Sequence, residues 1–152
     1  MTTAQLKTKD IVIDEVFPHR AETIWKMLTS AELMTRWMMQ PKGFQAVEGA
    51  DFTFHTNPAG AWDGIIHCTV LEVVPNRRLS YAWKGGDEGN VGYGSRLDTI
   101  VTFSLTQTEA GTRVRLVHAG FETPRNDIAY KNMSEGWAKC VKRLDAATGE
   151  ND

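Results

Sequence analysis

Cysteine is scarce in this sequence, and long apolar runs are missing from it. Only Cys68 and Cys140 occur, far apart and outside any CxxC pattern, so we expect two free thiols rather than a disulfide. The N-terminal stretch MTTAQLKTKD lacks the apolar core of a signal peptide, and no run of about eighteen apolar residues could span a bilayer. We therefore expect a cytoplasmic protein with no membrane partner.

A strong excess of charge of either sign is also absent. The formal net charge of -2 offers no general attraction for a phosphate backbone, so we expect no nucleic acid partner. The chain has 152 residues, of which 41% are hydrophobic and 24% charged, and this suits one globular domain with one core. The expectation is a single domain over residues 1–152, with its core from about residue 10 to residue 147.

The motifs of several common chemistries are missing. The sequence has no GxSxG, no HExxH and no Walker loop. His55 and His67 fall in separate predicted strands and His19 precedes a helix, so the histidines lack the spacing of a zinc site. The glycine-rich stretch KGGDEGNVGYGSR is not followed by a helix start, and we interpret it as a flexible hairpin that is a candidate gate rather than a phosphate cradle. We assign no metal, no cofactor and no catalytic residue.

The first forty residues predict a strand followed by two short helices. DIVIDEVF, residues 10–17, is rich in β-branched residues and stops before a proline, which predicts a strand. In AETIWKML, residues 21–28, apolar residues recur at three and four positions, as in a helix. Thr29 as N-cap, with Glu32 completing a capping box, predicts a second helix that ends near Met39.

From about residue 43 to residue 119 the apolar period changes to two. The strand-like segments are DFTFHT, DGIIHCTVLEVV, RLSYAW, LDTIVTFSLTQT and TRVRLVHAG. PNRR and EAGT look like hairpin turns between them, and KGGDEGNVGYG like a longer, mobile one. Residues 126–148 return to helical spacing, with Gly149 as a C-terminal cap. This order predicts an α+β fold in which one long helix lies across a curved antiparallel sheet.

Two features of the predicted sheet and helix need a physical explanation. Alternation places Tyr81, Trp83, Phe103 and His118 on the bulky, inward face of the sheet. An inward imidazole needs a partner, either as a neutral core histidine or as a group that orients a ligand or acts as a general base. Gly136 lies inside the helical pattern, which predicts close approach of the sheet backbone or a bend.

Four segments carry a resemblance to a known family. They are IWKMLTSAELMTRWM, VLEVVPNRRLSYAW, VTFSLTQTEAGTRVRLVHAGF and SEGWAKCVKRL. In this order the chain resembles the activator of heat-shock protein 90 (Hsp90) ATPase homologue-like domains. These belong to the START-like (SRPBCC) superfamily, with the Bet v-like allergens and the polyketide cyclases. The resemblance covers about residues 11–144, and the chain departs from many relatives at Ala31, where they carry a proline, and at Met38, where they carry a second tryptophan.

The resemblance implies a helix-grip (START-like, Bet v-like) fold with a cavity between the sheet and the long C-terminal helix. Two short helices would close one end, and LMTRWMMQP, residues 33–41, would form the floor or lid, since methionine side chains adapt to irregular space. The candidate ligand-binding residues come from this segment, the inward sheet face and the helix stripe. They are Trp37, Met38, Phe54, Tyr81, Trp83, Phe103, His118, Met133 and Trp137.

Three functions follow from these observations and the resemblance. The leading hypothesis is binding of a small apolar or aromatic molecule in this cavity without turnover. The second is an enzyme resembling the polyketide cyclases, in which His118 and Tyr81 would move protons on a bound compound. The third is a protein-interaction module of the Hsp90 co-chaperone type, with a chaperone as partner. Formation of a homodimer is left open by the sequence.

Overall fold

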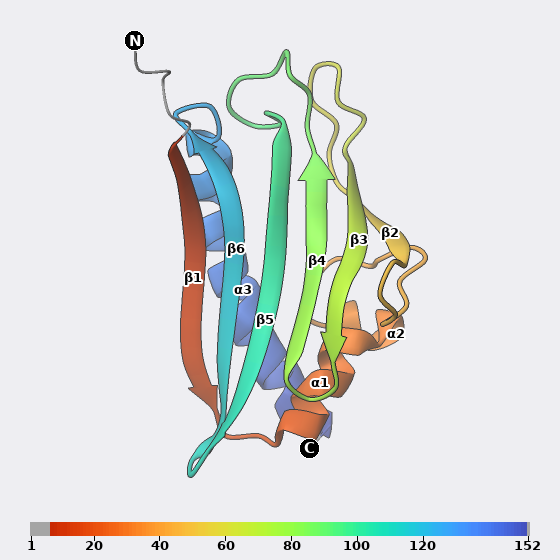
Figure 1. Cartoon of the computed structure of the whole chain (residues 1–152), viewed down its shortest axis with the longest axis vertical. Coiled ribbons are helices and arrows are strands. Elements are labelled where there is room, and N and C mark those ends of the chain that lie inside the picture. Colours follow the sequence, from red (N-terminus) through yellow and green to blue (C-terminus); the bar gives the residue numbers. More distant parts are fainter. Residues whose placement is uncertain (1–6, 152) are drawn as a thin grey trace.

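Six antiparallel strands form one curved sheet, and a long C-terminal helix lies across one of its faces (Figure 1). The structure is a computed structural model that describes residues 7–151. The strands are β1 (Lys7–Phe17), β2 (Asp51–His55), β3 (Ile65–Val74), β4 (Arg78–Gly85), β5 (Leu97–Thr108) and β6 (Gly111–Thr123). The helices are α1 (Ala21–Thr29), α2 (Ala31–Met34) and α3 (Asp127–Asn151). This is the predicted α+β helix-grip fold.

The strand order is β1-β6-β5-β4-β3-β2, so β2 to β6 form a meander and β1 returns to pair with β6. Both predicted hairpin turns are confirmed, because Val74 pairs with Arg78 and Thr108 pairs with Gly111. The register shifts between Val70 and Glu72, a local irregularity of the kind that bends a strand. The sheet therefore presents a concave face to α3.

The concave face and α3 share the core. Leu79, Tyr81 and Trp83 are each at most 3% exposed, as the alternation predicted. Trp137 and Leu144 on α3 are buried against this layer in the same cluster. At the C-terminal end of α3, His19 Nε2 lies 2.7 Å from Asp145 Oδ1, which ties the start of α1 to the helix. The two short helices thus lie near that end of α3 (Figure 1).

Two expectations about the second short helix were wrong: its N-cap at Thr29 with Glu32 in a capping box, and its end near Met39. Ser30, not Thr29, is the N-cap of α2, because its Oγ accepts a hydrogen bond from the Leu33 N–H at 3.2 Å. Thr29 is the last residue of α1, and its hydroxyl donates instead to the Trp25 carbonyl within that helix. The second helix ends at Met34 rather than near Met39.

Two glycines of α3, Gly136 and Gly149, do not have the structural roles that the sequence predicted for them. Helix α3 continues through Gly149 to Asn151, so Gly149 is not its C-terminal cap. A Cβ added at Gly136 would meet no atom within 4 Å, so the sheet backbone does not approach this residue closely. Gly136 faces open space, and the predicted close approach was wrong.

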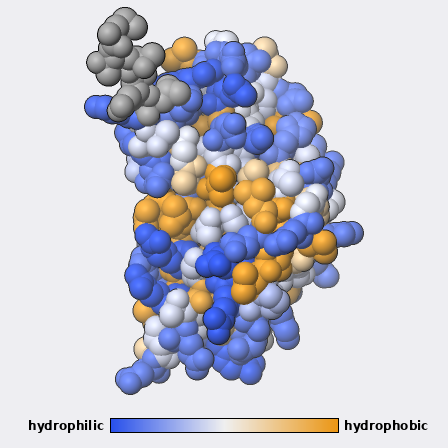
Figure 2. Space-filling view, viewed as in Figure 1, coloured by the Kyte–Doolittle hydropathy of each residue, from blue (hydrophilic) through white to orange (hydrophobic). Residues whose placement is uncertain are grey.

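The convex face of the sheet carries apolar side chains. Val12, Val16 and Ile100 are between 45% and 51% exposed. Figure 2 shows apolar residues gathered in a band across the middle of this face. Among residues 7–151, no helix is both long and apolar enough to cross a membrane.

Candidate functional site

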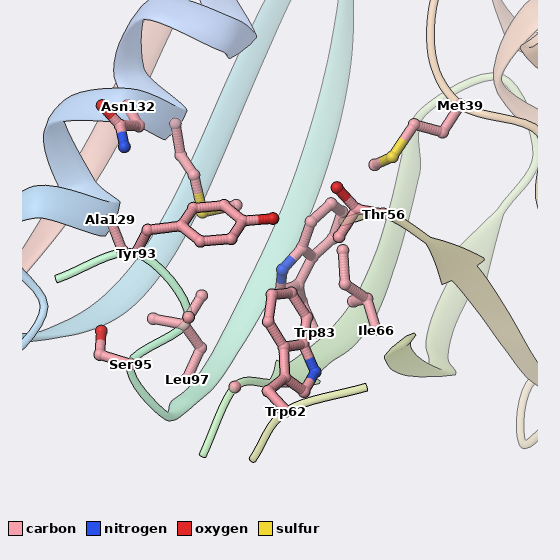
Figure 3. Close-up of a pocket in the computed structure, with 14 residues that line it drawn as sticks. Met39, Thr56, Trp62, Ile66, Trp83, Tyr93, Ser95, Leu97, Ala129 and Asn132 are labelled. Carbon is pink, nitrogen blue, oxygen red and sulfur yellow. The ribbon is translucent and has the colours of Figure 1, made fainter. Parts of the chain in front are cut away.

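A pocket of about 180 Å³ opens between the concave face, the first turns of α3 and two loops (Figure 3). None of its lining residues, all within residues 7–151, carries a charge. The lining residues are Met39, Thr56, Trp62, Ile66, Trp83, Gly85, Gly86, Tyr93, Gly94, Ser95, Leu97, Ala129, Asn132 and Met133. A pocket of this composition suits an apolar body.

The two loops that enclose the pocket are β2–β3 (residues 56–64) and β4–β5 (residues 86–96), and hydrogen bonds join them. The Tyr93 hydroxyl donates to the Asn57 carbonyl at 2.7 Å. Asn90 Nδ2 donates to the Ala59 carbonyl at 2.7 Å and to the Gly94 carbonyl at 3.1 Å. These bonds hold the aromatic rings of Tyr93 and Trp62 together, with centroids 5.9 Å apart. The glycine-rich hairpin is therefore one wall of the pocket.

A buried asparagine ties the β4–β5 loop to the start of α3. Asn126 is 1% exposed, and its Nδ2 donates to Ser95 Oγ at 2.9 Å and to the Arg96 carbonyl at 3.0 Å. Its Oδ1 accepts from the Glu122 N–H at 2.9 Å, which completes its bonding at the end of β6. Asn126 thus sets the position of the loop relative to the helix residues that form the opposite wall.

Glycines make the space that the pocket occupies. Gly85 ends the inward row that begins Leu79, Tyr81, Trp83, and a Cβ there would lie 3.4 Å from Trp62 and 3.7 Å from Ile66. The inward row of β4 therefore has no side chain at its last position, at this end of the sheet. Gly86 has φ of +78°, and a Cβ would lie 2.1 Å from the Ser95 carbonyl oxygen, so only glycine fits this turn.

Four of the nine predicted ligand-binding residues lie at this end of the molecule. Trp83 and Met133 line the pocket. Met38 and Trp137, together with Trp83 and Met133, line a second, more open hollow of about 310 Å³ that also shares Met39 with the first. The structure thus brings these four together beside the first half of α3.

The other five predicted residues lie in the closed core and line neither hollow. Trp37 is 1% exposed, and its ring N–H donates to the Met27 carbonyl at 2.9 Å. Its ring meets Phe103 edge-on, with centroids 5.8 Å apart. The five, each at most 1% exposed, are Trp37, Phe54, Tyr81, Phe103 and His118. The segment around Trp37 therefore contributes Met34 and Trp37 to the core, and Met38 and Met39 to the hollows.

His118 is held in a chain of hydrogen bonds. Trp137 Nε1 donates to His118 Nδ1 at 2.9 Å, and His118 Nε2 lies 2.7 Å from Thr99 Oγ1. Thr99 Oγ1 in turn donates to the Trp83 carbonyl at 2.8 Å. Burial lowers the pKa of His118 from 6.5 to about 3, so the imidazole is neutral. Both ring nitrogens are occupied by protein partners.

Tyr81 is the other residue of the predicted proton-transfer pair, and it lies on the same sheet face as His118. Within residues 7–151 no hydrogen bond joins the two side chains. Burial raises the pKa of Tyr81 well above its ordinary value of 10, so its phenol stays protonated. In the same described region, no group of three His, Cys, Asp or Glu side chains could hold a metal ion.

Several pocket residues were missed by sequence reasoning. Trp62 and Tyr93 lie in loops, where no hydrophobic period marks them. A tyrosine in the middle of a glycine-rich turn was the available signal, because such a turn needs no large apolar side chain of its own. Leu97 also lines the pocket and shares the inward phase of Phe103 on β5, whereas Ala129 carried no such signal.

A curved antiparallel sheet around a long helix, with an apolar pocket between them, defines a START-like helix-grip protein. The model of the activator of Hsp90 ATPase homolog 1-like protein family matches residues 18–149, and this chain belongs to that family. Comparison with curated proteins finds no match.

Solved structures agree with this assignment. Protein MLL2253 from Mesorhizobium loti is 30% identical, with a TM-score of 0.80 over 95% of this chain and 99% of its own. CalU16 from Micromonospora echinospora is 23% identical, with a TM-score of 0.70 over 93% of this chain and 76% of its own. The Aha1 dimer from Colwellia psychrerythraea is 20% identical, with a TM-score of 0.69 over 92% of this chain and 96% of its own. The two less similar structures share the fold.

Proposed function

We propose that this protein binds a small, largely apolar molecule in the pocket beside α3 and does not turn it over. The observation that carries the proposal is the uncharged lining of a pocket of about 180 Å³ beside the buried core. An apolar cavity of ~150 Å³ is large enough for one benzene ring. The family assignment supports the same function, because its superfamily includes ligand-binding folds of this shape.

The arrangement around His118 favours binding over catalysis of the polyketide cyclase type. A general base must reach the proton that it removes, directly or through one water. His118 is fully buried, and its two nitrogens are bonded to Trp137 and Thr99. The proposed ligand would therefore meet apolar walls rather than a proton acceptor at this histidine.

A titration with indane, a neutral molecule of one aromatic and one aliphatic ring, tests the proposal. We expect saturable amide chemical-shift changes at Trp83, Leu97 and Ala129, which line the pocket. The variant Ala129→Phe fills the pocket from α3 and should abolish these changes. Ala138 is exposed on the same helix, so Ala138→Phe is the matched control and should bind as the wild type does. Shifts that never saturate, or equal loss in both variants, would count against the pocket as a binding site.

A second candidate function is protein contact through the convex face of the sheet. Val12 and Ile100 are about half exposed there, and apolar patches on a sheet face are common at interfaces (Figure 2). A related structure of the same fold is described as a dimer, which favours a second copy as the occupant. Light scattering over a concentration series should then show a dimer that Ile100→Lys converts to a monomer. A monomer at every concentration would leave an Hsp90-type chaperone, tested by pull-down, as the other partner.

A further inference from the structure

The ring N–H of Trp83 lies at the pocket wall and donates to no protein atom among residues 7–151. Three other tryptophans donate to protein atoms: Trp37 to Met27, Trp62 to Ile65 and Trp137 to His118, at 2.9 to 3.0 Å. Trp83 is 3% exposed, and its Nε1 has no hydrogen bond partner among residues 7–151. Among residues 7–151, the only fully buried side-chain nitrogen or oxygen atom without a partner is Thr108 Oγ1, so Trp83 Nε1 keeps some accessible surface, and that surface faces the pocket.

The Trp83 ring is fixed in place by its neighbours. Its centroid lies 5.5 Å from that of Phe54, 5.2 Å from that of His118 and 5.9 Å from that of Trp137. These contacts occupy the side of the ring that faces the core, so the indole cannot turn to find another acceptor there. Figure 3 shows the ring nitrogen turned toward the part of the pocket where Tyr93 and Trp62 lie.

The other polar side chains that line the pocket differ from Trp83, because each has a protein partner or is open to water. The Tyr93 hydroxyl already donates to the Asn57 carbonyl, and Ser95 Oγ accepts from Asn126. Thr56 is half-buried and Asn132 is exposed, so water can satisfy both. The Trp83 N–H is thus a fixed donor at the pocket wall that has no protein partner and that a bound molecule can reach with an acceptor.

We propose that Trp83 Nε1 is the recognition donor for a neutral ligand of one or two rings that carries a hydrogen-bond acceptor, such as a ketone or an ether oxygen. This inference rests on the proposed function of the pocket. The ligand is neutral because no lining residue could compensate a buried charge, and a single N–H is too little for a carboxylate. Its rings would pack against the Trp83 face and the flexible side chains of Met39 and Met133.

Three probes of matched shape separate the contributions of the rings, the acceptor and a charge to binding affinity. They are indane, 1-indanone and indane-1-carboxylate. The first lacks an acceptor, the second adds a ketone and the third adds a charge. The expected dissociation constant of 1-indanone rises about threefold to tenfold in Trp83→Phe, the effect of one net hydrogen bond, while that of indane changes less than about twofold. Trp62→Phe is the matched control, because its N–H in the wild type is already bonded to the Ile65 carbonyl. It should not separate the two probes.

The wild-type protein supplies a second readout that does not depend on the variant folding. Saturating 1-indanone should move the Trp83 indole proton downfield in a ¹H–¹⁵N spectrum, while indane should not. Binding of both neutral probes without this shift, and without discrimination by Trp83→Phe, would mean that water satisfies the donor, and only the inference would fall. Tightest binding of the carboxylate would overturn the neutral class. If none of the three probes binds, the proposed function itself fails.

Discussion

The Trp137 indole donates a hydrogen bond to His118 Nδ1 across 2.9 Å and so joins α3 to the middle of β6. An indole N–H can only donate, so Nδ1 must be the acceptor and the imidazole proton must lie on Nε2. That proton faces Thr99 Oγ1, 2.7 Å away, whose own proton goes to the Trp83 carbonyl. One tautomer of a neutral histidine therefore satisfies every group in the chain.

The buried, neutral His118 predicts that the folded protein loses stability in acid. Because burial lowers the pKa of His118 to about 3, the unfolded state binds a proton between pH 6.5 and about 3 that the folded state does not. The free energy of unfolding should fall by up to about 1.4 kcal/mol per pH unit as pH decreases through this window. Urea unfolding between pH 4.5 and 6.5 measures the slope, and His118→Gln should remove that contribution. The exposed His55 provides the control in His55→Gln, which should keep the wild-type slope. Parallel curves for His118→Gln and the wild type would contradict the prediction.

The two thiols should react at different rates. Cys68 is 2% exposed, and burial raises the pKa of its thiol to about 12. Cys140 is only half-buried and lines the second hollow; burial raises its pKa, and the nearby Arg143 opposes that increase. The thiolate is the reactive form, so iodoacetamide at pH 8 should label Cys140 in the folded protein and Cys68 only after unfolding. Peptide mass spectrometry locates the label, and equal labelling of both in the folded protein would refute the difference.

The corrected environment of Gly136 changes the outcome expected for its substitution. A methyl group there meets nothing within 4 Å, and glycine in a helix interior costs about 1 kcal/mol relative to alanine. Gly136→Ala should therefore raise the free energy of unfolding by about that amount in chemical denaturation. A lower melting temperature for the variant would show that the helix needs glycine at this position.

The sheet could be predicted from the sequence because each strand has one buried face. Period two marks the inward row of Leu79, Tyr81 and Trp83 without knowledge of the partner strands. Helix ends were harder to predict from the sequence. Thr29 and Ser30 are both acceptable N-cap residues, and only the backbone conformation selects Ser30. Elements were thus predicted better than their boundaries.

The site could be predicted in part, because alternation gives the face of a residue but not its depth along the strand. Trp83 and Tyr81 share a face, yet Trp83 lies two residues nearer the open end, where Gly85 pairs with Leu97. Tyr81 pairs with Val101 further inside, where the core is filled. The walls supplied by the loops depend on long-range hydrogen bonds such as Tyr93 to Asn57, which no local pattern reports.

Gly85 gives the sharpest separation of binding from stability. It occupies an inward position on β4, its backbone is not in the left-handed region, and a Cβ would make ordinary contacts at 3.4 to 3.7 Å with Trp62, the Ile65 carbonyl and Ile66. Gly85 is the last residue of β4, and alanine loses less conformational freedom than glycine on folding, so Gly85→Ala should be at least as stable as the wild type. The added methyl group occupies pocket volume and should weaken indane binding several-fold. Gly136→Ala also adds a methyl group but does not line this pocket, so it serves as the control that should leave indane binding unchanged. Isothermal titration and urea unfolding on the same samples measure both quantities, and unchanged affinity in a stable Gly85→Ala would place the indane site elsewhere.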